Sequence, residues 1–362
     1  MHGQSTICGL LLLVSSLSVA QDRLQVVSST PLPKSIRARL GRGLRLGCSR
    51  DGGTLAALSP KVVGKDVEWT HEIVALTPGG TLKARIDLDK VLGAGMANIE
   101  DFAPGPDGEI YVVATRIWEH FERDQSGRII ERSRVRDSTL WLVRFNDTGQ
   151  FLAKTQIEVD YFAYIRIAVF PSGSFLVVGY LSHPTPPGVW AEEKLEPFSG
   201  IFSRDAGFLR RVELPDTVLV RDPRINWNVW QTTPMLADDG DIYVVMTGEK
   251  PSLAVVRADG TVYGVVGLHI PDGFLLTGAG IVGERLAGDI QAAESPFTQY
   301  FVESDIQSGD LILLHSLSGL GPLSGLGWKL ACPTRSHGII ALTPEGTLDT
   351  LMASTEVDGN VH

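Results

Sequence analysis

Three charged residues lie inside otherwise apolar stretches and are the first candidates for chemistry. Glu100 and Asp101 form a carboxylate pair in NIEDFAP, and Arg166 interrupts the apolar run YIRIAVF. Two carboxylates near a guanidinium can hold a polar ligand, or raise the pKa of one carboxyl so that it acts as a general acid. The alternative is that these groups are solvated or satisfied by neighbouring backbone, with no ligand involved.

Tryptophan and histidine form a second set of candidates, in the segments between apolar runs. These residues are Trp69, His71, Trp118, His120, His183, Trp190, Trp227 and Trp230. Trp rings stack on sugars and grip peptides, and segments rich in aromatic residues are rarely disordered. We therefore predict an aromatic ligand-binding surface, with RINWNVW as its strongest support. The alternative is that the rings only fill space between loops.

The motifs that would assign a reaction are missing from the sequence. It contains no G-x-S-x-G, H-E-x-x-H, G-x-x-x-x-G-K-[ST] or calcium-loop pattern. We therefore assign no catalytic residue, no metal ligand and no cofactor. A bound Ca²⁺ or other divalent metal is expected only if the protein is an enzyme.

A repeated sequence indicates which elements carry the candidates. PDGEIYVVAT (Pro106–Thr115) returns as DDGDIYVVMT (Asp238–Thr247), and weaker copies surround three other glycines. In each copy a turn precedes a strand rich in β-branched and aromatic residues. The turn glycines are Gly53, Gly108, Gly173, Gly240 and Gly309. Each marks the first hairpin of a predicted repeat.

A second hairpin pattern alternates with the first, as in Leu140–Ile157 and Leu253–Leu268. Each repeat therefore has four strands, and such sheets bury both faces when they pack in a closed ring. We predict an all-β fold, a β-propeller of six four-stranded blades. Five blades are clear in the sequence. The sixth is predicted to be short, begun by residues 352–357 and closed by the N-terminal strand Arg23–Ser29.

The two faces of the predicted disc differ in their connections. Turns within the hairpins are tight, whereas the connections at the other face are long, as functional loops often are. The long connections are predicted at 59–72, 116–138, 181–197, 215–231, 269–299 and 316–337. The aromatic candidates fall in these loops, and the charged ones fall on innermost strands that line the channel. We therefore predict that function lies at the loop side of the ring.

The connection Arg116–Ser138 differs from the other loops in composition. Its sequence, RIWEHFERDQSGRIIERSRVRDS, alternates the sign of its charges around a DQSG turn. The pattern predicts a hairpin that extends one blade and protrudes from the ring. It is either a solvated ribbon or an arm that docks a partner.

The pairing of DGxIYV with L-V-R-F-N-x-x-G is similar to that of secreted bacterial six-bladed propellers related to NHL-repeat and lactonase-like proteins. The clearest copies are Asp107–Val113 with Leu140–Gly149, and Asp239–Val245 with Leu253–Gly260. The resemblance covers nearly all of the predicted mature chain. It implies the fold alone, because such scaffolds carry lactonases, lyases and pure binding modules.

The N-terminal residues predict export. Ile7–Val19 is apolar but short for a membrane span, and Ser18 and Ala20 suit a signal peptidase, although no Lys or Arg precedes them. We predict a signal peptide, 1–20, then a single propeller domain, 21–362, that is secreted or periplasmic. Cys48 and Cys332 remain in that domain, either as a disulfide or as two free thiols.

Charge and composition narrow the class of partner. The 362-residue chain has a net charge of −10 from scattered acidic residues, so a nucleic-acid partner is not indicated, nor is a membrane span in the mature chain. We predict an exported module that binds a small molecule, glycan or peptide on its Trp- and His-rich loop face. The alternatives are a lactonase-like or lyase-like enzyme with a channel-centred site, and a scaffold or assembly protein that docks through residues 116–138.

Overall fold

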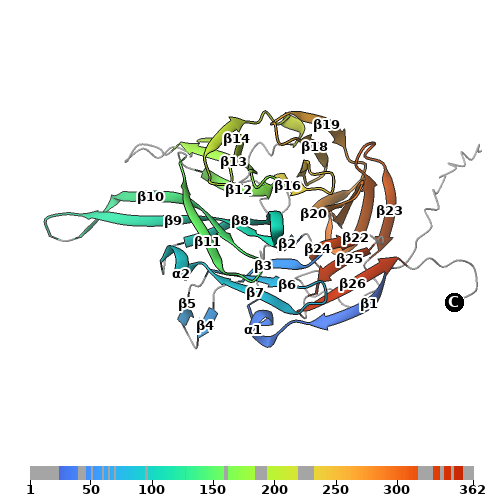
Figure 1. The fold of residues 1–362 in the computed structure, drawn as a ribbon, viewed down its shortest axis with the longest axis horizontal. Helices are drawn as coiled ribbons and strands as arrows, with labels where there is room; N and C mark the ends of the chain where they lie inside the picture. The colour runs from blue at the N-terminus through green and yellow to red at the C-terminus, as the bar shows by residue number, and fades with distance from the viewer. Residues whose placement is uncertain are drawn as a thin grey trace, which may run out of the picture.

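The computed structural model describes residues 24–39, 46–49, 52–58, 61–63, 66–68, 71–93, 97–126, 128–158, 162–183, 194–218, 232–316, 329–334, 338–343 and 346–353. Within these ranges the chain forms six four-stranded antiparallel sheets, arranged as the blades of a β-propeller (Figure 1). The predicted all-β fold class is confirmed.

Blades are numbered in chain order, with the innermost strand given first. Blade 1 contains β2 (Leu46–Cys48), β3 (Thr54–Leu58), β6 (Glu72–Leu76) and β7 (Leu82–Asp87). Blade 2 contains β8 (Ala97–Pro104), β9 (Ile110–Arg123), β10 (Ile129–Phe145) and β11 (Phe151–Ile157). Blade 3 contains β12 (Phe162–Val169), β13 (Phe175–His183), β14 (Lys194–Phe202) and β15 (Phe208–Arg211).

The remaining blades follow the same order. Blade 4 contains β16 (Thr232–Leu236), β17 (Ile242–Met246), β18 (Ser252–Val256) and β19 (Val262–Gly267). Blade 5 contains β20 (Phe274–Val282), β21 (Arg285–Ala292), β22 (Ser295–Asp305) and β23 (Leu311–Ser316). Blade 6 contains β24 (Lys329–Thr334), β25 (Gly338–Leu342), β26 (Thr347–Ala353) and, from the N-terminal side, β1 (Leu24–Pro31).

Short elements connect the blades. The helices are α1 (Lys34–Arg37), between blades 6 and 1, and α2 (Asp89–Leu92), between blades 1 and 2. The 3-10 turns are η1 (Pro106–Gly108) and η2 (Asp216–Val218). A small sheet of β4 (Lys61–Val63) and β5 (Asp66–Glu68) lies in the connection before β6.

The hydrophobic core lies between blades. One buried cluster joins blades 1 and 2 around Phe102 and Phe145, and another joins blades 2 and 3 around Phe175 and Phe202. Equivalent clusters join blades 3 and 4, blades 4 and 5, and blades 6 and 1. The six innermost strands also contact one another in sequence around the ring, from β2 through β24 and back to β2. Each blade therefore needs a neighbour on both sides, as the sequence pattern predicts.

The ring closes between the two ends of the chain. β1 pairs with β26 from Leu24↔Ala353 to Pro31↔Thr347, which confirms the predicted closure by an N-terminal strand. A disulfide between Cys48 and Cys332 then joins β2 to β24, the innermost strands of blades 1 and 6. The two cysteines whose state the sequence left open are therefore bridged.

The structure corrects the assignment of the last two blades. The segments 269–299 and 316–337, predicted as loops, contain β20, β21, the start of β22 and β24. Glycines in β20 and β21 weaken the strand pattern, but packing requires small residues there. A Cβ at Gly280, for example, would lie 2.7 Å from Pro333 Cδ in blade 6.

The corrected strands change two predictions, the position of the Gly309 turn and the start of blade 6. The Gly309 turn joins the third and fourth strands of blade 5, not the first and second as predicted. Blade 6 begins at β24 instead of at residues 352–357, and it has four strands like the other blades. Residues 354–357 lie outside the described part of the chain.

The connections separate onto two faces. We call the side with the first-to-second and third-to-fourth strand turns the turn face, and the opposite side the loop face. Turns on the turn face close through short backbone hydrogen bonds, such as Gly105 N–H to Glu109 O at 2.7 Å. From the loop-face end of blade 2, β9 and β10 continue as a paired ribbon that protrudes from the ring, as predicted for residues 116–138 (Figure 1).

Replacing Gly309 by alanine should destabilise the fold. Gly309 has a φ of +76°, and a Cβ there would lie 2.0 Å from the Gly267 carbonyl oxygen of blade 4. Left-handed backbone strain and the clash together should lower the free energy of unfolding by about 2–4 kcal/mol. Urea denaturation of both proteins measures this loss.

The matched control is Gly283→Ala, in the turn between β20 and β21. Gly283 also has a positive φ, +58°, but a Cβ there would meet no described atom within 4 Å. Only the strain of a left-handed backbone applies at Gly283, so the loss of unfolding free energy should be about 1 kcal/mol. Equal losses in the two variants would show that Gly309 does not serve the contact between blades.

Candidate functional site

Four innermost strands have a β-bulge in the half nearer the loop face. In each, the register shifts by one residue against the second strand of the blade. The residues at these shifts are Glu100 in β8, Tyr164 in β12, Thr277 in β20 and Ala331 in β24, and we call them the bulge ring. Bulges bend strands and re-aim side chains, and they are frequent near binding sites.

The bulge at Glu100 determines which blade Asp101 faces. Side chains alternate in a regular strand, so Ile99 and Asp101 would otherwise face the same neighbour. Instead, Ile99 packs on the cluster between blades 1 and 2, and Asp101 Oδ2 accepts the Ile167 N–H of blade 3 at 2.7 Å. Because β12 is an edge strand of its sheet, this bond satisfies a backbone group beside the channel.

The bulge in β12 places Arg166 and Tyr164 next to this bond. The Arg166 side chain is buried, and its Nη1 donates to the Ile165 carbonyl at 3.2 Å. Tyr164 has a φ of +53°, a conformation that costs a non-glycine residue about 1 kcal/mol or more. Its ring meets Tyr180 edge-on, with centroids 6.2 Å apart. Strain of this kind persists only where surrounding structure holds it.

Blade 5 adds a carboxylate that the sequence analysis missed. Thr277 Oγ1 donates to Asp289 Oδ2 at 2.6 Å, and Asp289 lies on β21 opposite Gly278. A Cβ at Gly278 would lie 2.4 Å from Asp289 Oδ1, so this carboxylate occupies side-chain space over the innermost strand. Asp289 is recognisable in the sequence as a polar residue, but the glycines of its segment predict a loop.

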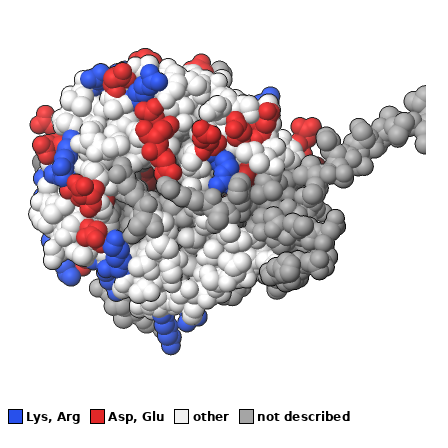
Figure 2. Space-filling view, turned by 45° about the vertical axis from the view of Figure 1, so that its right-hand side comes forward, with Lys and Arg blue, Asp and Glu red and all other residues white. Residues whose placement is uncertain are grey.

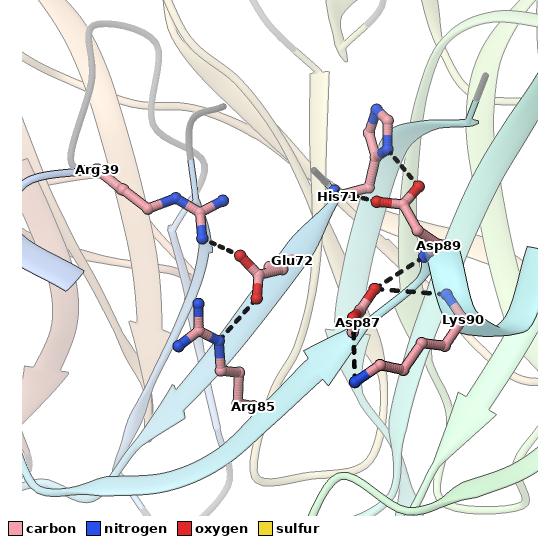
Figure 3. A network of polar contacts seen from close by, with 7 residues as sticks. All are labelled: Arg39, His71, Glu72, Arg85, Asp87, Asp89 and Lys90. Atoms are coloured by element: carbon pink, nitrogen blue, oxygen red, sulfur yellow. Dashed lines mark hydrogen bonds and ion pairs between the residues drawn. The ribbon is translucent and has the colours of Figure 1, made fainter. Parts of the chain in front are cut away.

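His71 lies in a separate polar network at the loop face of blade 1 (Figure 3). Its Nδ1 contacts Asp89 Oδ1 at 2.8 Å, and its backbone N–H donates to Asp89 Oδ2 at 3.0 Å. A carboxylate only accepts hydrogen bonds, so Nδ1 carries the proton and Nε2 is the acceptor in the neutral ring. Figure 3 shows Nε2 directed away from Asp89. An imidazole held in this way can accept a hydrogen bond.

Glu72, the next residue, connects blade 1 to the segment between blades 6 and 1. Its carboxylate pairs with Arg39, which follows α1, and with Arg85 Nε at 2.7 Å (Figure 3). The Glu72 and Arg39 side chains are only 11% and 7% exposed. The buried Glu72 carboxylate has a buried counter-charge in Arg39, and removing one partner of such a pair is costly because the other charge stays buried. The network therefore has a structural role.

The turn face carries polar pairs that join blades 2 and 3. Glu109 accepts from Arg144 at 3.4 Å and from Arg204, while the Tyr111 hydroxyl donates to the Gly173 carbonyl at 3.2 Å. Burial, with the nearby Glu109 charge, raises the pKa of Tyr111. In the view of Figure 2, acidic and basic side chains are interspersed along the upper and left parts of the surface. The pairs named here satisfy one another, so they favour a structural role for this face.

The structure locates only part of the predicted site. Glu100, Asp101 and Arg166 lie on adjacent innermost strands, whereas His71 lies among the outer strands of blade 1. Trp118 and His120 lie in β9, opposite Asp137 and Val135 of β10, and His183 ends β13 opposite Lys194. Trp69, Trp190, Trp227 and Trp230 lie outside the described residues, so the aromatic surface stays a prediction.

The described residues show neither a metal-binding cluster nor a membrane-spanning helix. No group of three or more His, Cys, Asp or Glu side chains there is arranged to hold a metal ion. None of the helices described above has the length and apolar character needed to cross a bilayer.

Comparisons with known proteins add the following. No family model matches the sequence, and no match to a curated protein reaches significance. A protein of unknown function from Bacteroides caccae is similar in structure, with TM-score 0.44 and 14% identity over 76% of this chain and 83% of that one. A variant of Synechocystis apocarotenoid oxygenase has TM-score 0.39 and 13% identity over 76% of this chain and 62% of that one. The present chain thus spans less than two thirds of that oxygenase.

Similarities of this size do not bear on function. The six-bladed architecture rests on the strand pairings themselves. The resemblance to NHL-repeat and lactonase-like propellers of bacteria stays a prediction.

Replacing Glu72 by glutamine should destabilise the protein strongly. The change removes the carboxylate charge that pairs with the buried Arg39 guanidinium, so we expect a loss of about 3–5 kcal/mol in the free energy of unfolding. The control is Glu196→Gln, which breaks an exposed pair with Arg211 at 3.5 Å and should cost less than about 1 kcal/mol. Chemical denaturation compares the two, and similar losses would contradict a structural role for the Glu72 network.

Proposed function

We propose that this propeller binds a small, hydroxyl-rich polar molecule, of the sugar class, at the loop-face mouth of its central channel. The observation that carries the proposal is the bulge ring. Four innermost strands depart from regular pairing in the same half. A propeller needs no such departure to close, because β2 and β16 pair with their neighbours without any shift.

The chemistry around the bulge ring suits hydroxyl groups. Glu100 and Asp101 are half-buried carboxylates, which accept strong hydrogen bonds, and Arg166 is a donor beside them. Tyr164 and Tyr180 add aromatic surface next to these polar groups. Sites for small polar ligands combine a few fixed polar groups with aromatic walls. The tryptophans predicted at the loop face would extend such a wall.

We also propose that the chain is exported. The Cys48–Cys332 disulfide supports this, because disulfides persist in oxidising compartments and are rare in reducing ones. The apolar segment Ile7–Val19 supports it independently. A ligand for this protein would then come from outside the cytoplasm.

The enzyme alternative has weaker support. The His71–Asp89 pair resembles an oriented general base, but it lies among the outer strands of blade 1. The carboxylates of the bulge ring lie on a different set of strands. Because no described contact assembles base and carboxylates into one site, we put forward binding alone.

The binding proposal is tested with the residue 21–362 protein and a panel of monosaccharides, disaccharides, amino acids and dipeptides. We expect a neutral sugar to raise the melting temperature, since a ligand at 100 times its Kd adds about 2.7 kcal/mol of stability. Glu100→Gln should then lower the affinity for that sugar by about tenfold, because one hydrogen bond to a charged group contributes about that much. Isothermal titration measures the affinity.

The control for this test is Asp259→Asn, which removes one negative charge from an exposed turn on the opposite face. It should leave the sugar affinity unchanged. If no sugar stabilises the protein, or if both variants weaken binding equally, the channel mouth is not the site.

Export predicts two properties of protein taken from outside the cytoplasm. Its N-terminal sequence should begin at Gln21, and alkylation should detect no free thiol. Reduction should lower its free energy of unfolding by about 2–5 kcal/mol, whereas a Cys48→Ser, Cys332→Ser double variant should not respond to reductant. Retention of residues 1–20, or recovery of the protein only from the cytoplasm, would count against export.

A further inference from the structure

The ribbon of β9 and β10 leaves its blade as an isolated pair of strands. β8 pairs with β9 only up to Arg116, and β11 pairs with β10 only from Leu140 onward. Beyond these residues, β9 and β10 pair with each other from Ile117↔Ser138 to Phe121↔Arg134 and, after a register shift, again at Arg123↔Ile129. Figure 1 shows this part extending away from the ring. Among the described strands, none continues the sheet on either edge of the ribbon.

Such a ribbon lacks the usual sources of stability. Two strands without a third strand or a second layer are marginal in water. The tip is nevertheless a closed turn, in which Asp124 Oδ1 accepts from Ser126 N–H at 2.8 Å and Arg128 N–H at 3.0 Å. The isolated part also contains large apolar residues: Ile117, Trp118, Phe121, Ile129, Ile130 and Val135. Apolar residues on an element without a core favour a partner that covers them.

The charges of the ribbon indicate what kind of partner fits. β10 has arginine at alternate positions, Arg132, Arg134 and Arg136, and the last two lie opposite Phe121 and Glu119. Positions 134 and 136 share one face of the ribbon. Residues 116–138 hold six arginines against five carboxylates, a net charge of +1, so the rest of the chain carries −11. The ribbon is a slightly basic element on an acidic protein.

The same arginines oppose pairing between two copies of this chain. If two β10 edges paired antiparallel about a two-fold axis at residue 134, 135 or 136, arginine would stand opposite arginine in each of these three registers. Like charges directly opposite each other destabilise a strand pair. Charged edges are a known protection against such self-association. The partner strand that fits is acidic.

We propose that the free edge of β10, residues 130–139, binds an extended segment of another protein with Asp or Glu at alternate positions. The segment adds a strand in line with β11, where β11 stops pairing at Leu140. Main-chain hydrogen bonds supply affinity, and the acidic residues pair with Arg134 and Arg136. The added strand provides the third strand that the ribbon lacks.

The test uses the residue 21–362 protein and two fluorescein-labelled decapeptides, one alternating Glu with Val and one alternating Lys with Val. Fluorescence anisotropy should detect binding of the Glu peptide only, weakening as salt is raised. An R134E/R136E variant should bind the Glu peptide at least about tenfold more weakly and should bind the Lys peptide. R210E/R211E, which reverses two exposed arginines on β15, should behave like the unchanged protein.

A second peptide separates strand addition from charge attraction. A Glu peptide N-methylated at alternate residues keeps its charge but cannot pair along one edge, so it should not bind. The proposal is overturned if this peptide binds as well as its parent, or if R134E/R136E binds the Glu peptide normally. It is also overturned if light scattering shows a dimer that R134E/R136E dissociates, because the occupant would then be a second copy. Melting temperatures confirm that each variant is folded.

Discussion

The whole structure depends on each sheet burying two apolar faces at once. A single four-stranded blade cannot do this in water, and a row of blades leaves its two ends exposed. Only a closed ring covers every face. The ring closes at the junction between blades 6 and 1, so the contacts there hold the two ends of the ring together. β1 completes blade 6 at the outer edge, the disulfide joins β2 to β24 at the inner edge, and Arg39 pairs with Glu72 beside them.

Closing the ring leaves backbone hydrogen-bonding groups of the innermost strands facing the channel. Each innermost strand has one edge with no further strand, so its backbone groups need other partners. Asp101 supplies one by accepting the Ile167 N–H, and it can do so because the bulge at Glu100 turns it toward blade 3. The irregular pairing, the strained Tyr164 and the buried Arg166 therefore occur on innermost strands, where one strand edge has no neighbouring strand and side chains bond its backbone groups. Our proposed ligand site lies at the same location.

The sequence predicted the fold better than the site. Blades 1 to 4 are recognisable in the sequence because tight glycine turns separate apolar strands. Blade 5 is harder to recognise, because packing against Pro333 requires glycine at position 280, and glycine weakens the strand pattern. Glu100, Asp101 and Arg166 stood out as charges within apolar runs. Asp289 did not, because its position depends on Gly278 making room for it across a strand pair. Bulges depend on register between strands, which a single strand's sequence does not determine.

The pairing of β1 with β26 also determines how the molecule would respond to force. Leu24 lies opposite Ala353, so a pull applied to both ends would load the β1–β26 hydrogen bonds one pair at a time, as in opening a zipper. Such a seam yields at low force. Extension would then stop at Cys48 and Cys332, because the chain between them is a covalent loop that tension cannot lengthen. The molecule would shed its end segments while most of its blades remained folded.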